Sequence, residues 1–260
     1  MKKYLVIGNP IEHSLSPKLH NHWIKENNID AVYDKKQLNE TDIEAIISEV
    51  KDGKIDGINV TVPFKKLVIP FLDQLTALAK EAQSVNTIFK KNNKVVGDNT
   101  DVDGFEHSLK HINYSVKNKK VFILGAGGVA SSIILALKRI GVPKIILSNR
   151  TKKKAEDLKK IYADLEIIEW GETPNFNMII NTTSLGLKND DKIKLNYADI
   201  GINKLFYDVI YNPSKTSFLL EGEKLGNKIE NGKMMFIYQA RLAFKIWHNI
   251  LPKINDKLLD

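Results

Sequence analysis

The chain of 260 residues suits one large or two modest domains, and its 43% hydrophobic residues can bury a full core. No apolar stretch approaches eighteen residues, and polar residues interrupt the first apolar run, so we expect no membrane span and no signal peptide. The chain has no cysteine, which excludes disulfides and cysteine zinc sites and suits the cytoplasm. The net charge of +8 comes almost entirely from lysine, with only three arginines, so we expect a small anionic substrate and no nucleic-acid partner.

Strand and helix signals alternate along the first hundred residues. Strands are predicted at 4–7, 31–33, 58–62, 84–89 and 95–96. One helix is predicted to begin at Ser16-Pro17, with the serine as N-cap and the proline as first helical residue, and another at Thr41 with a capping-box pattern. This alternation predicts an α/β layer with mostly parallel strands.

A second unit is predicted to begin near residue 101. Helices are expected at 101–111, 131–140, 214–225 and 234–250, and strands at 120–124, 145–147, 166–168, 178–180 and 206–210. We therefore predict a first domain at residues 1–100, completed by the C-terminal helix 236–260, and a Rossmann-like doubly wound domain at 101–235.

The segment after the strand at 120–124 fits the pattern G-x-G-x-x-[G/A]. Gly125 permits a tight turn, Gly127 lets the backbone approach a pyrophosphate, and the small Ala130 lets the helix pack on the strand. The helix N-terminus then offers free N–H groups to phosphates. Since a strand and a helix flank this turn, we favour dinucleotide binding over a turn of purely structural glycines.

The end of the next strand indicates which dinucleotide binds. NAD sites usually carry an acidic residue there for the ribose hydroxyl, whereas this chain has Asn149-Arg150-Thr151, followed by Lys154. Arg150 can form a planar fork to a 2′-phosphate, and Lys154 can add charge. The sequence therefore predicts NADP as the cofactor.

Two polar segments, 59–65 and 97–101, follow strands of the first unit, the position where open α/β sheets bind ligands. Oxidation of an alcohol needs a base for the hydroxyl proton, and a lysine held by a carboxylate can serve. Lys65 and Asp101 could form that pair, although a single lysine is more often a solvated surface residue. His20 and His22 do not share a helix face, so no metal site is expected.

Taken together, these motifs resemble the NADP-dependent shikimate dehydrogenase family over nearly the whole chain. The matching segments are GNPIEHSLSPKLHN at 8–21, NVTVPFK at 59–65, SVNTI at 84–88, GDNTDVDGF at 97–105, GAGGVA at 125–130, NRT at 149–151, NTTSLGL at 181–187, YDVIYNP at 207–213 and GKMMFIYQA at 232–240. The chain departs from the family at Gln83-Ser84, where Gly-Ala is common, and at Lys154, where arginine is common.

The resemblance implies an activity and a set of residues. The reaction would be reduction of 3-dehydroshikimate by NADPH to shikimate, in aromatic amino acid biosynthesis, by a monomer or homodimer. Lys65 would be the catalytic acid/base and Asp101 its partner, and both would also contact the substrate. The other substrate contacts would be Ser14, Ser16, Thr61, Asn86, Tyr211 and Gln239. The cofactor contacts would be Gly125, Ala126, Gly127, Gly128, Val129, Asn149, Arg150, Thr151, Lys154, Val209 and Gly232.

Two alternatives stay open. One is a paralogue that also accepts quinate or uses NAD, against which Ser14, Ser16 and Arg150 argue. The other is a non-catalytic ligand sensor on the same fold, which would not need Lys65 and Asp101.

Overall fold

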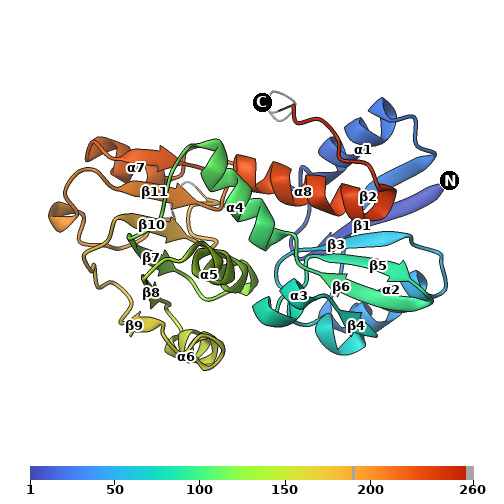
Figure 1. Ribbon diagram of the computed structural model, residues 1–260, viewed down its shortest axis with the longest axis horizontal. Helices are drawn as coiled ribbons and strands as arrows, with labels where there is room; N and C mark the ends of the chain where they lie inside the picture. The colour runs from blue at the N-terminus through green and yellow to red at the C-terminus, as the bar shows by residue number, and fades with distance from the viewer. Residues whose placement is uncertain (189–190, 256–260) are drawn as a thin grey trace. The chain divides into compact units, whose positions relative to one another are not determined.

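The computed structural model describes residues 1–188 and 191–255 (Figure 1). Two compact units are present: unit 1 comprises Met1–Gly104 and the chain from Ile237 onward, and unit 2 comprises Phe105–Phe236. The chain leaves unit 1 within helix α4 (Asp101–His111) and returns to it within helix α8 (Lys233–His248).

Unit 1 contains a six-stranded sheet in the order β2-β1-β3-β5-β6-β4. Its strands are β1 (Lys2–Gly8), β2 (Ala31–Gln37), β3 (Gly57–Val60), β4 (Gln74–Leu75), β5 (Thr87–Lys91) and β6 (Lys94–Asp98). Only β5 runs against its neighbours β3 and β6. The reversal to β6 occurs at Asn92 and Asn93, whose φ values of 50° and 60° are those of a tight hairpin turn.

Helices complete unit 1. They are α1 (Ser16–Glu26), α2 (Ile43–Lys51) and α3 (Ala77–Ala82), with 3₁₀ turns η1 (Glu40–Asp42) and η2 (Ile69–Phe71). The buried face of α1 carries Leu19, His20, Trp23 and Ile24. Trp23 also packs edge-on against Phe244 of α8, with ring centroids 5.6 Å apart, so the first and last helices share one core.

Unit 2 is a parallel six-stranded sheet in the order β12-β11-β10-β7-β8-β9. Its elements are β7 (Lys120–Leu124), α5 (Gly128–Ile140), β8 (Lys144–Ser148), α6 (Lys152–Ile161), β9 (Glu166–Ile168), β10 (Met178–Asn181), η3 (Tyr197–Asp199), β11 (Leu205–Asp208), α7 (Ser217–Lys224) and β12 (Lys228–Glu230). Counted from β7, the order is the 3-2-1-4-5-6 arrangement of dinucleotide-binding sheets, with its switch point between β7 and β10. The predicted α/β class with a Rossmann-like unit is confirmed.

Several predicted boundaries were wrong by a few residues. Leu15, not Ser16, is the N-cap of α1, and the Ser14 hydroxyl accepts a hydrogen bond from the Ser16 N–H at 3.3 Å. The capping box lies at Asn39 and Asp42, one turn before α2. The strand predicted at 84–89 starts at Thr87, since the Ser84 carbonyl accepts from the Asn99 side chain instead of pairing in the sheet.

Within the described residues, no helix combines the length and apolar character needed to cross a membrane.

Candidate active site

Lys65 and Asp101 form a buried ion pair in unit 1. Lys65 lies in the loop after β3, where the neighbouring Phe64 is 1% exposed and anchors the segment in the core. Asp101 is the first residue of α4, where the partial positive charge of the helix terminus favours a carboxylate. The Lys65 Nζ lies 2.5 Å from the Asp101 Oδ2, and the two side chains are only 11% and 6% exposed. Each charge therefore depends on the other for compensation.

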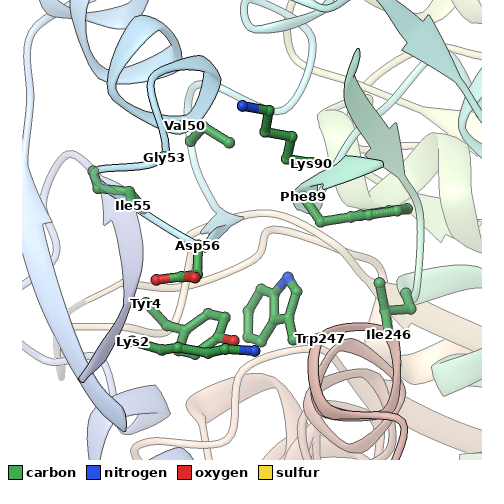
Figure 2. Close-up of a pocket in the computed structure, with 10 residues that line it drawn as sticks. All are labelled: Lys2, Tyr4, Val50, Gly53, Ile55, Asp56, Phe89, Lys90, Ile246 and Trp247. Carbon is green, nitrogen blue, oxygen red and sulfur yellow. The ribbon is translucent and has the colours of Figure 1, made fainter. Parts of the chain in front are cut away.

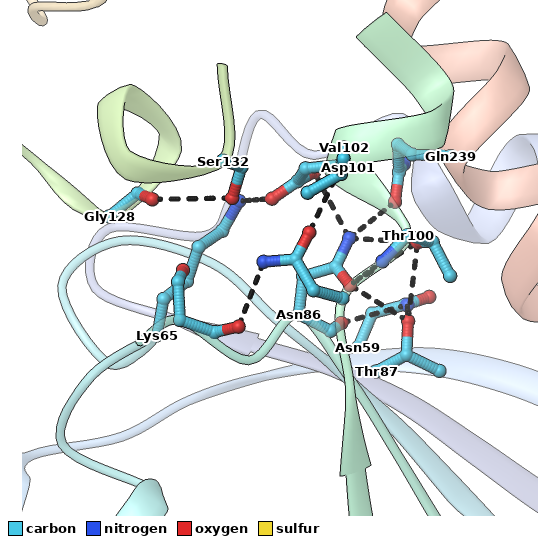
Figure 3. Close-up of polar contacts among 12 residues, drawn as sticks. Asn59, Lys65, Asn86, Thr87, Thr100, Asp101, Val102, Gly128, Ser132 and Gln239 are labelled. Atoms are coloured by element: carbon cyan, nitrogen blue, oxygen red, sulfur yellow. Dashed lines mark hydrogen bonds and ion pairs between the residues drawn. The ribbon is translucent and has the colours of Figure 1, made fainter. Parts of the chain in front are cut away.

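Asn86 connects this ion pair to the rest of the site (Figure 3). Its amide Nδ2 donates to the Asp101 Oδ1 at 3.0 Å, to the Thr100 hydroxyl at 2.9 Å and to the Gln239 Oε1 at 3.2 Å. Its Oδ1 accepts from the Thr100 N–H at 2.8 Å. The Asp101 carboxylate is thus held from one side by an ammonium and from the other by an amide, which leaves its orientation fixed.

Three buried residues that were not among the predicted site residues complete the network. Asn59 donates to the Asn86 carbonyl at 3.1 Å and to the Thr87 hydroxyl at 3.2 Å, while its Oδ1 accepts from the Tyr33 hydroxyl at 2.6 Å. Thr87 and Thr100 both donate to the Asn86 Oδ1. Asn59 and Thr87 face each other across the β3–β5 pairing, a register that local sequence patterns do not reveal.

The loops after β1 and β3 lie side by side. The Thr61 N–H donates to the Ile7 carbonyl at the end of β1, and the Asn9 N–H donates to the Val62 carbonyl, both at 2.9 Å. Ser14 lies in the loop after β1 and is partly exposed, and Ser16 is the first residue of α1 and is buried. Because β1 and β3 are parallel, the loops that follow them, both of which carry hydroxyl groups, lie together at the C-terminal ends of these strands.

The glycine-rich turn of unit 2 has room for a phosphate-bearing ligand. Gly125 has a φ of 104°, which favours glycine, and Gly127 is exposed, with open space where a Cβ would stand. Gly127 is the N-cap of α5, and no side chain caps that helix. Gly128 and Val129 follow, both partly exposed. A helix N-terminus with no side-chain cap and an open approach fits the pyrophosphate of a dinucleotide.

Asn149 fixes this turn to the loop after β8. Its Oδ1 accepts from the Ala126 N–H at 3.0 Å, and its Nδ2 donates to the Thr151 carbonyl at 2.7 Å. The Ala126 N–H is thus occupied within the protein. Asn149 joins the two segments that would border the cofactor.

Two cations near Asn149, namely Arg150 and Lys154, are available for a ligand, whereas the two lysines between them are engaged. Lys152 pairs with Glu169, and Lys153 lies 3.3 Å from Asp157. Arg150 and Lys154 are exposed, and neither makes an ion pair or side-chain hydrogen bond within residues 1–188 and 191–255. This arrangement fits a 2′-phosphate, which needs positive charge that no acidic residue already neutralises.

The remaining three predicted residues belong to unit 2. Val209 and Gly232 are in direct backbone contact, because a Cβ on Gly232 would lie 2.0 Å from the Val209 carbonyl oxygen. Tyr211 stacks on Phe236 with ring centroids 4.6 Å apart. Only glycine at position 232 permits this approach of two backbones.

A separate cavity of about 200 Å³ in unit 1 lies away from these groups. Figure 2 shows Lys2 and Tyr4 of β1, Asp56 before β3 and Trp247 of α8 among the residues that line it. These positions are at the start of β1 and β3, whereas the polar loops follow the ends of the same strands. None of the predicted site residues lines it. The described part of the chain also shows no group of three acidic or histidine side chains that could hold a metal ion.

The fold and these sites define a class: two-unit α/β proteins with one dinucleotide-binding sheet. Two family models match the chain, and they specify a narrower class than the fold does. "Shikimate dehydrogenase substrate binding domain" matches residues 6–88, and "Shikimate / quinate 5-dehydrogenase" matches residues 107–183. The chain belongs to the shikimate dehydrogenase family.

Individual relatives cover the whole chain. The shikimate dehydrogenase (NADP(+)) of Pelagibacter ubique (strain HTCC1062) is 57% identical, with 100% of this chain and 98% of the relative covered. The crystal structure of the Aquifex aeolicus shikimate dehydrogenase is 37% identical, with a TM-score of 0.89 and coverage of 99% and 96%. The Thermus thermophilus enzyme, solved in complex with NADP(H) and shikimate, is 27% identical, with a TM-score of 0.90 and coverage of 100% and 97%.

Proposed function

We propose that the protein is a shikimate dehydrogenase, which reduces 3-dehydroshikimate to shikimate with NADPH. The observation that carries the proposal is the buried Lys65–Asp101 pair, an acid/base couple at the end of the unit 1 sheet. Membership of the family, the relatives named for NADP(+) and the Rossmann strand order of unit 2 support it. A protein that only sensed a ligand would not need this pair.

In the proposed reaction, bound NADPH supplies a hydride to the carbonyl carbon of the substrate. The Lys65 ammonium donates a proton to the carbonyl oxygen, and the product is an alcohol; the reverse reaction returns that proton to the lysine. Asp101 holds the ammonium in place and accepts a hydrogen bond from a substrate hydroxyl. Asn86 fixes Asp101 in turn, at 3.0 Å.

The substrate is a small carboxylate with several hydroxyl groups, so each of its polar groups needs a partner once water leaves. We assign the carboxylate to Ser14 and Ser16, and the ring hydroxyls and carboxylate to the remaining set: Thr61, Asn86, Tyr211 and Gln239. Unit 1 supplies all of these side chains except Tyr211. Hydrogen-bond number and shape would then discriminate substrates more than charge does.

For the cofactor, we assign the pyrophosphate to the turn Gly125–Val129, and the adenosine 2′-phosphate to Asn149, Arg150, Thr151 and Lys154. The uncapped N-terminus of α5 and the free charge on Arg150 support this assignment. Val209 and Gly232 would border the nicotinamide. Unit 2 is accordingly the NADP-binding domain, and unit 1 the substrate-binding domain.

The direct test is an absorbance assay for NADPH formation with purified protein, shikimate and NADP⁺. Lys65→Ala should lower kcat by roughly 10²- to 10⁴-fold, because the proton then has no positioned acceptor. The affinity for shikimate should change much less. The exposed Lys80→Ala, in α3, serves as the control and should leave kcat unchanged. Normal turnover by Lys65→Ala would remove the catalytic assignment.

A second candidate is activity on quinate, which the description of the family model matched at residues 107–183 includes. The same assay with quinate, and with NAD⁺ in place of NADP⁺, measures it. We propose that the main reaction belongs to aromatic amino acid biosynthesis, which membership of the family supports. We propose the cytoplasm as its compartment, because a biosynthetic reduction of this kind draws on the NADPH present there.

A further inference from the structure

Asp208 is a buried carboxylate to which the proposed reaction gives no task. It is the last residue of β11 and is 0% exposed. Its Oδ2 accepts from the Thr216 hydroxyl at 2.6 Å, and its Oδ1 accepts from the Ile210 N–H at 3.0 Å. The Asn181 Nδ2 lies 3.1 Å from both oxygens. The Asp208 carboxylate therefore binds one backbone N–H group and the side chains of two other residues.

These groups belong to the loops that follow β10 and β11. Asn181 is the last residue of β10, and its Oδ1 accepts from the Thr183 N–H at 3.0 Å and the Thr183 hydroxyl at 2.7 Å. The Thr183 hydroxyl in turn accepts from the Leu185 N–H. Asp208 thus anchors the loop 181–187 through Asn181, and the loop 209–216 through Ile210 and Thr216.

The loop 181–187 in turn touches the glycine-rich turn. The Thr182 hydroxyl donates to the Leu124 carbonyl at 2.8 Å and to the Gly125 carbonyl at 3.2 Å. A Cβ on Gly125 would lie 2.7 Å from the Thr182 Oγ1, so the two segments are in close contact. They flank the switch point between β7 and β10, where sheets of this topology bind their ligands.

We propose that Asp208 is a positioning residue for NADPH, which holds the loops after β10 and β11 in the geometry that the glycine-rich turn and Val209 need for binding. The inference rests on the proposed function, since it takes NADPH as the ligand of unit 2. Asp208 itself does not touch the cofactor; it acts through Asn181 and Thr182 on the turn, and through Ile210 on the Val209–Gly232 contact, where the Gly232 N–H donates to the Ile210 carbonyl at 3.1 Å.

A carboxylate is the group that this position requires. All its contacts are donors, and a carboxylate only accepts. An asparagine has nearly the same shape but turns an NH₂ group toward at least one of these donors. Burial raises the pKa of Asp208 to about 6, while the hydrogen bonds from Thr216, Ile210 and Asn181 favour the charged form. The charged form therefore predominates at neutral pH.

The test is the affinity for NADPH, measured by the fluorescence of the bound nucleotide, with thermal melting of each variant as the measure of folding. Asp208→Asn should raise the Kd for NADPH roughly 10- to 100-fold, because small displacements of binding groups are costly. In the absorbance assay its KM for NADP⁺ should rise by a similar factor, with the KM for shikimate much less affected. The exposed Asp199→Asn is the matched control and should leave both values unchanged.

Thr216 gives an independent and milder variant pair. Thr216→Val removes one donor to Asp208 and should weaken NADPH binding, as Asp208→Asn does. Thr216→Ser keeps the hydroxyl and should keep the wild-type affinity for NADPH. A folded Asp208→Asn protein with wild-type NADPH affinity would overturn the proposal. If Asp208→Asn does not fold, the Thr216 pair decides, and equal NADPH affinity of its two members would overturn it. If the wild-type protein binds NADPH but does not turn over shikimate, the proposed function fails while these affinities still decide the role of Asp208.

Discussion

At the scale of single residues, the two candidate sites use charge in opposite ways. Lys65 and Asp101 are buried together, so loss of either side chain leaves an uncompensated charge in the interior. Arg150 is exposed and is paired with no acidic residue among the described residues. Water solvates this charge and no acidic residue neutralises it, so Arg150 can bind an anionic ligand. The effect of its removal should therefore appear in binding and not in folding.

This contrast predicts the behaviour of Arg150→Ala. The KM for NADPH should rise about 10- to 100-fold, which corresponds to the loss of one charge-assisted contact, while the KM for NADH should hardly change because NADH has no 2′-phosphate. The measurement is initial-rate kinetics with both cofactors. Lys152→Ala is the matched control, since Lys152 is engaged with Glu169. Equal losses with NADPH and NADH would refute the assignment of Arg150 to the 2′-phosphate.

Sequence reasoning could locate the polar segments 59–65 and 97–101 but not the contacts between them. Lys65 and Asp101 stand out because polar residues that follow a strand invite a functional explanation. Asn59 and Thr100 belong to these segments and Thr87 does not, but nothing local in the sequence indicates that the three side chains meet. Their hydrogen bonds exist because β3, β5 and β6 pair in one particular register, which places Asn59 opposite Thr87 and Thr87 opposite Asp98. Register between distant strands depends on the whole sheet.

At the scale of elements, the proposed substrate site of unit 1 depends on a close approach of α4 and α8. Gly104 of α4 packs on Gln239 of α8, where a Cβ would lie 2.9 Å from the Gln239 Cβ and 3.0 Å from its backbone nitrogen. Gln239 accepts from Asn86 at 3.2 Å. Because glycine at position 104 has no side chain, α8 can approach α4 closely, and this approach positions Gln239, a proposed substrate contact.

Gly104→Ala should move this part of α8 away from α4, because backbone atoms cannot yield as a flexible side chain does. We expect the KM for shikimate to rise about tenfold or more, with a much smaller change in the Kd for NADPH. Kinetics at saturating NADP⁺ measure the first value, and nucleotide fluorescence the second.

Gly222→Ala is the matched control for this helix-packing argument. Gly222 lies in α7 of unit 2, and its Cβ would come within 2.5 Å of the Phe206 ring. This variant should lose stability without a specific change in the KM for shikimate. If the two variants changed that KM equally, overpacking in general, and not the position of Gln239, would explain the result.

Most of the long elements could be predicted from sequence, whereas the short strands β4 of unit 1 and β12 of unit 2 could not. β7 has the predicted bounds, since its apolar run ends directly at the glycine-rich turn. β4 has two residues and β12 has three, and each pairs with a longer strand, β6 for β4 and β11 for β12. At Gln83 the chain has a φ of 47°, a conformation that favours glycine; this is a position where the chain departs from the common Gly-Ala of its family.

At the scale of the whole molecule, α1 and the segment that follows α8 are joined in unit 1. The Trp23 indole N–H of α1 donates to the Lys253 carbonyl at 3.1 Å, and the Arg241 Nε of α8 donates to the Pro252 carbonyl at 2.6 Å. The segment after α8 is therefore fastened to the first helix. Unit 1 therefore joins residues 230 positions apart in the chain.

His20 lies at the centre of this junction and makes it sensitive to acid. Its ring stacks on Tyr33 at 4.2 Å and contacts Trp23 and Trp247. Neither ring nitrogen has a hydrogen-bond partner among the described residues. Burial, with a smaller contribution from His248, lowers the pKa of His20 to about 3. The folded protein therefore keeps this ring neutral at a pH where the unfolded chain takes up a proton.

The unfolded state binds more protons than the folded state between about pH 6.5 and pH 3, so unit 1 should lose stability as the pH falls through this range. One pKa unit corresponds to about 1.4 kcal/mol, which predicts a loss of about 2 kcal/mol on going from neutral pH to pH 5. His20→Phe keeps an aromatic ring against Tyr33 and cannot be protonated, so its loss over this range should be smaller by that amount. Urea unfolding followed by tryptophan fluorescence at pH 7.5 and pH 5 measures the difference, since Trp23 and Trp247 contact the ring at position 20. His13→Gln, at an exposed position, should keep the wild-type dependence, and an unchanged dependence in His20→Phe would assign the acid sensitivity to another group, such as His248.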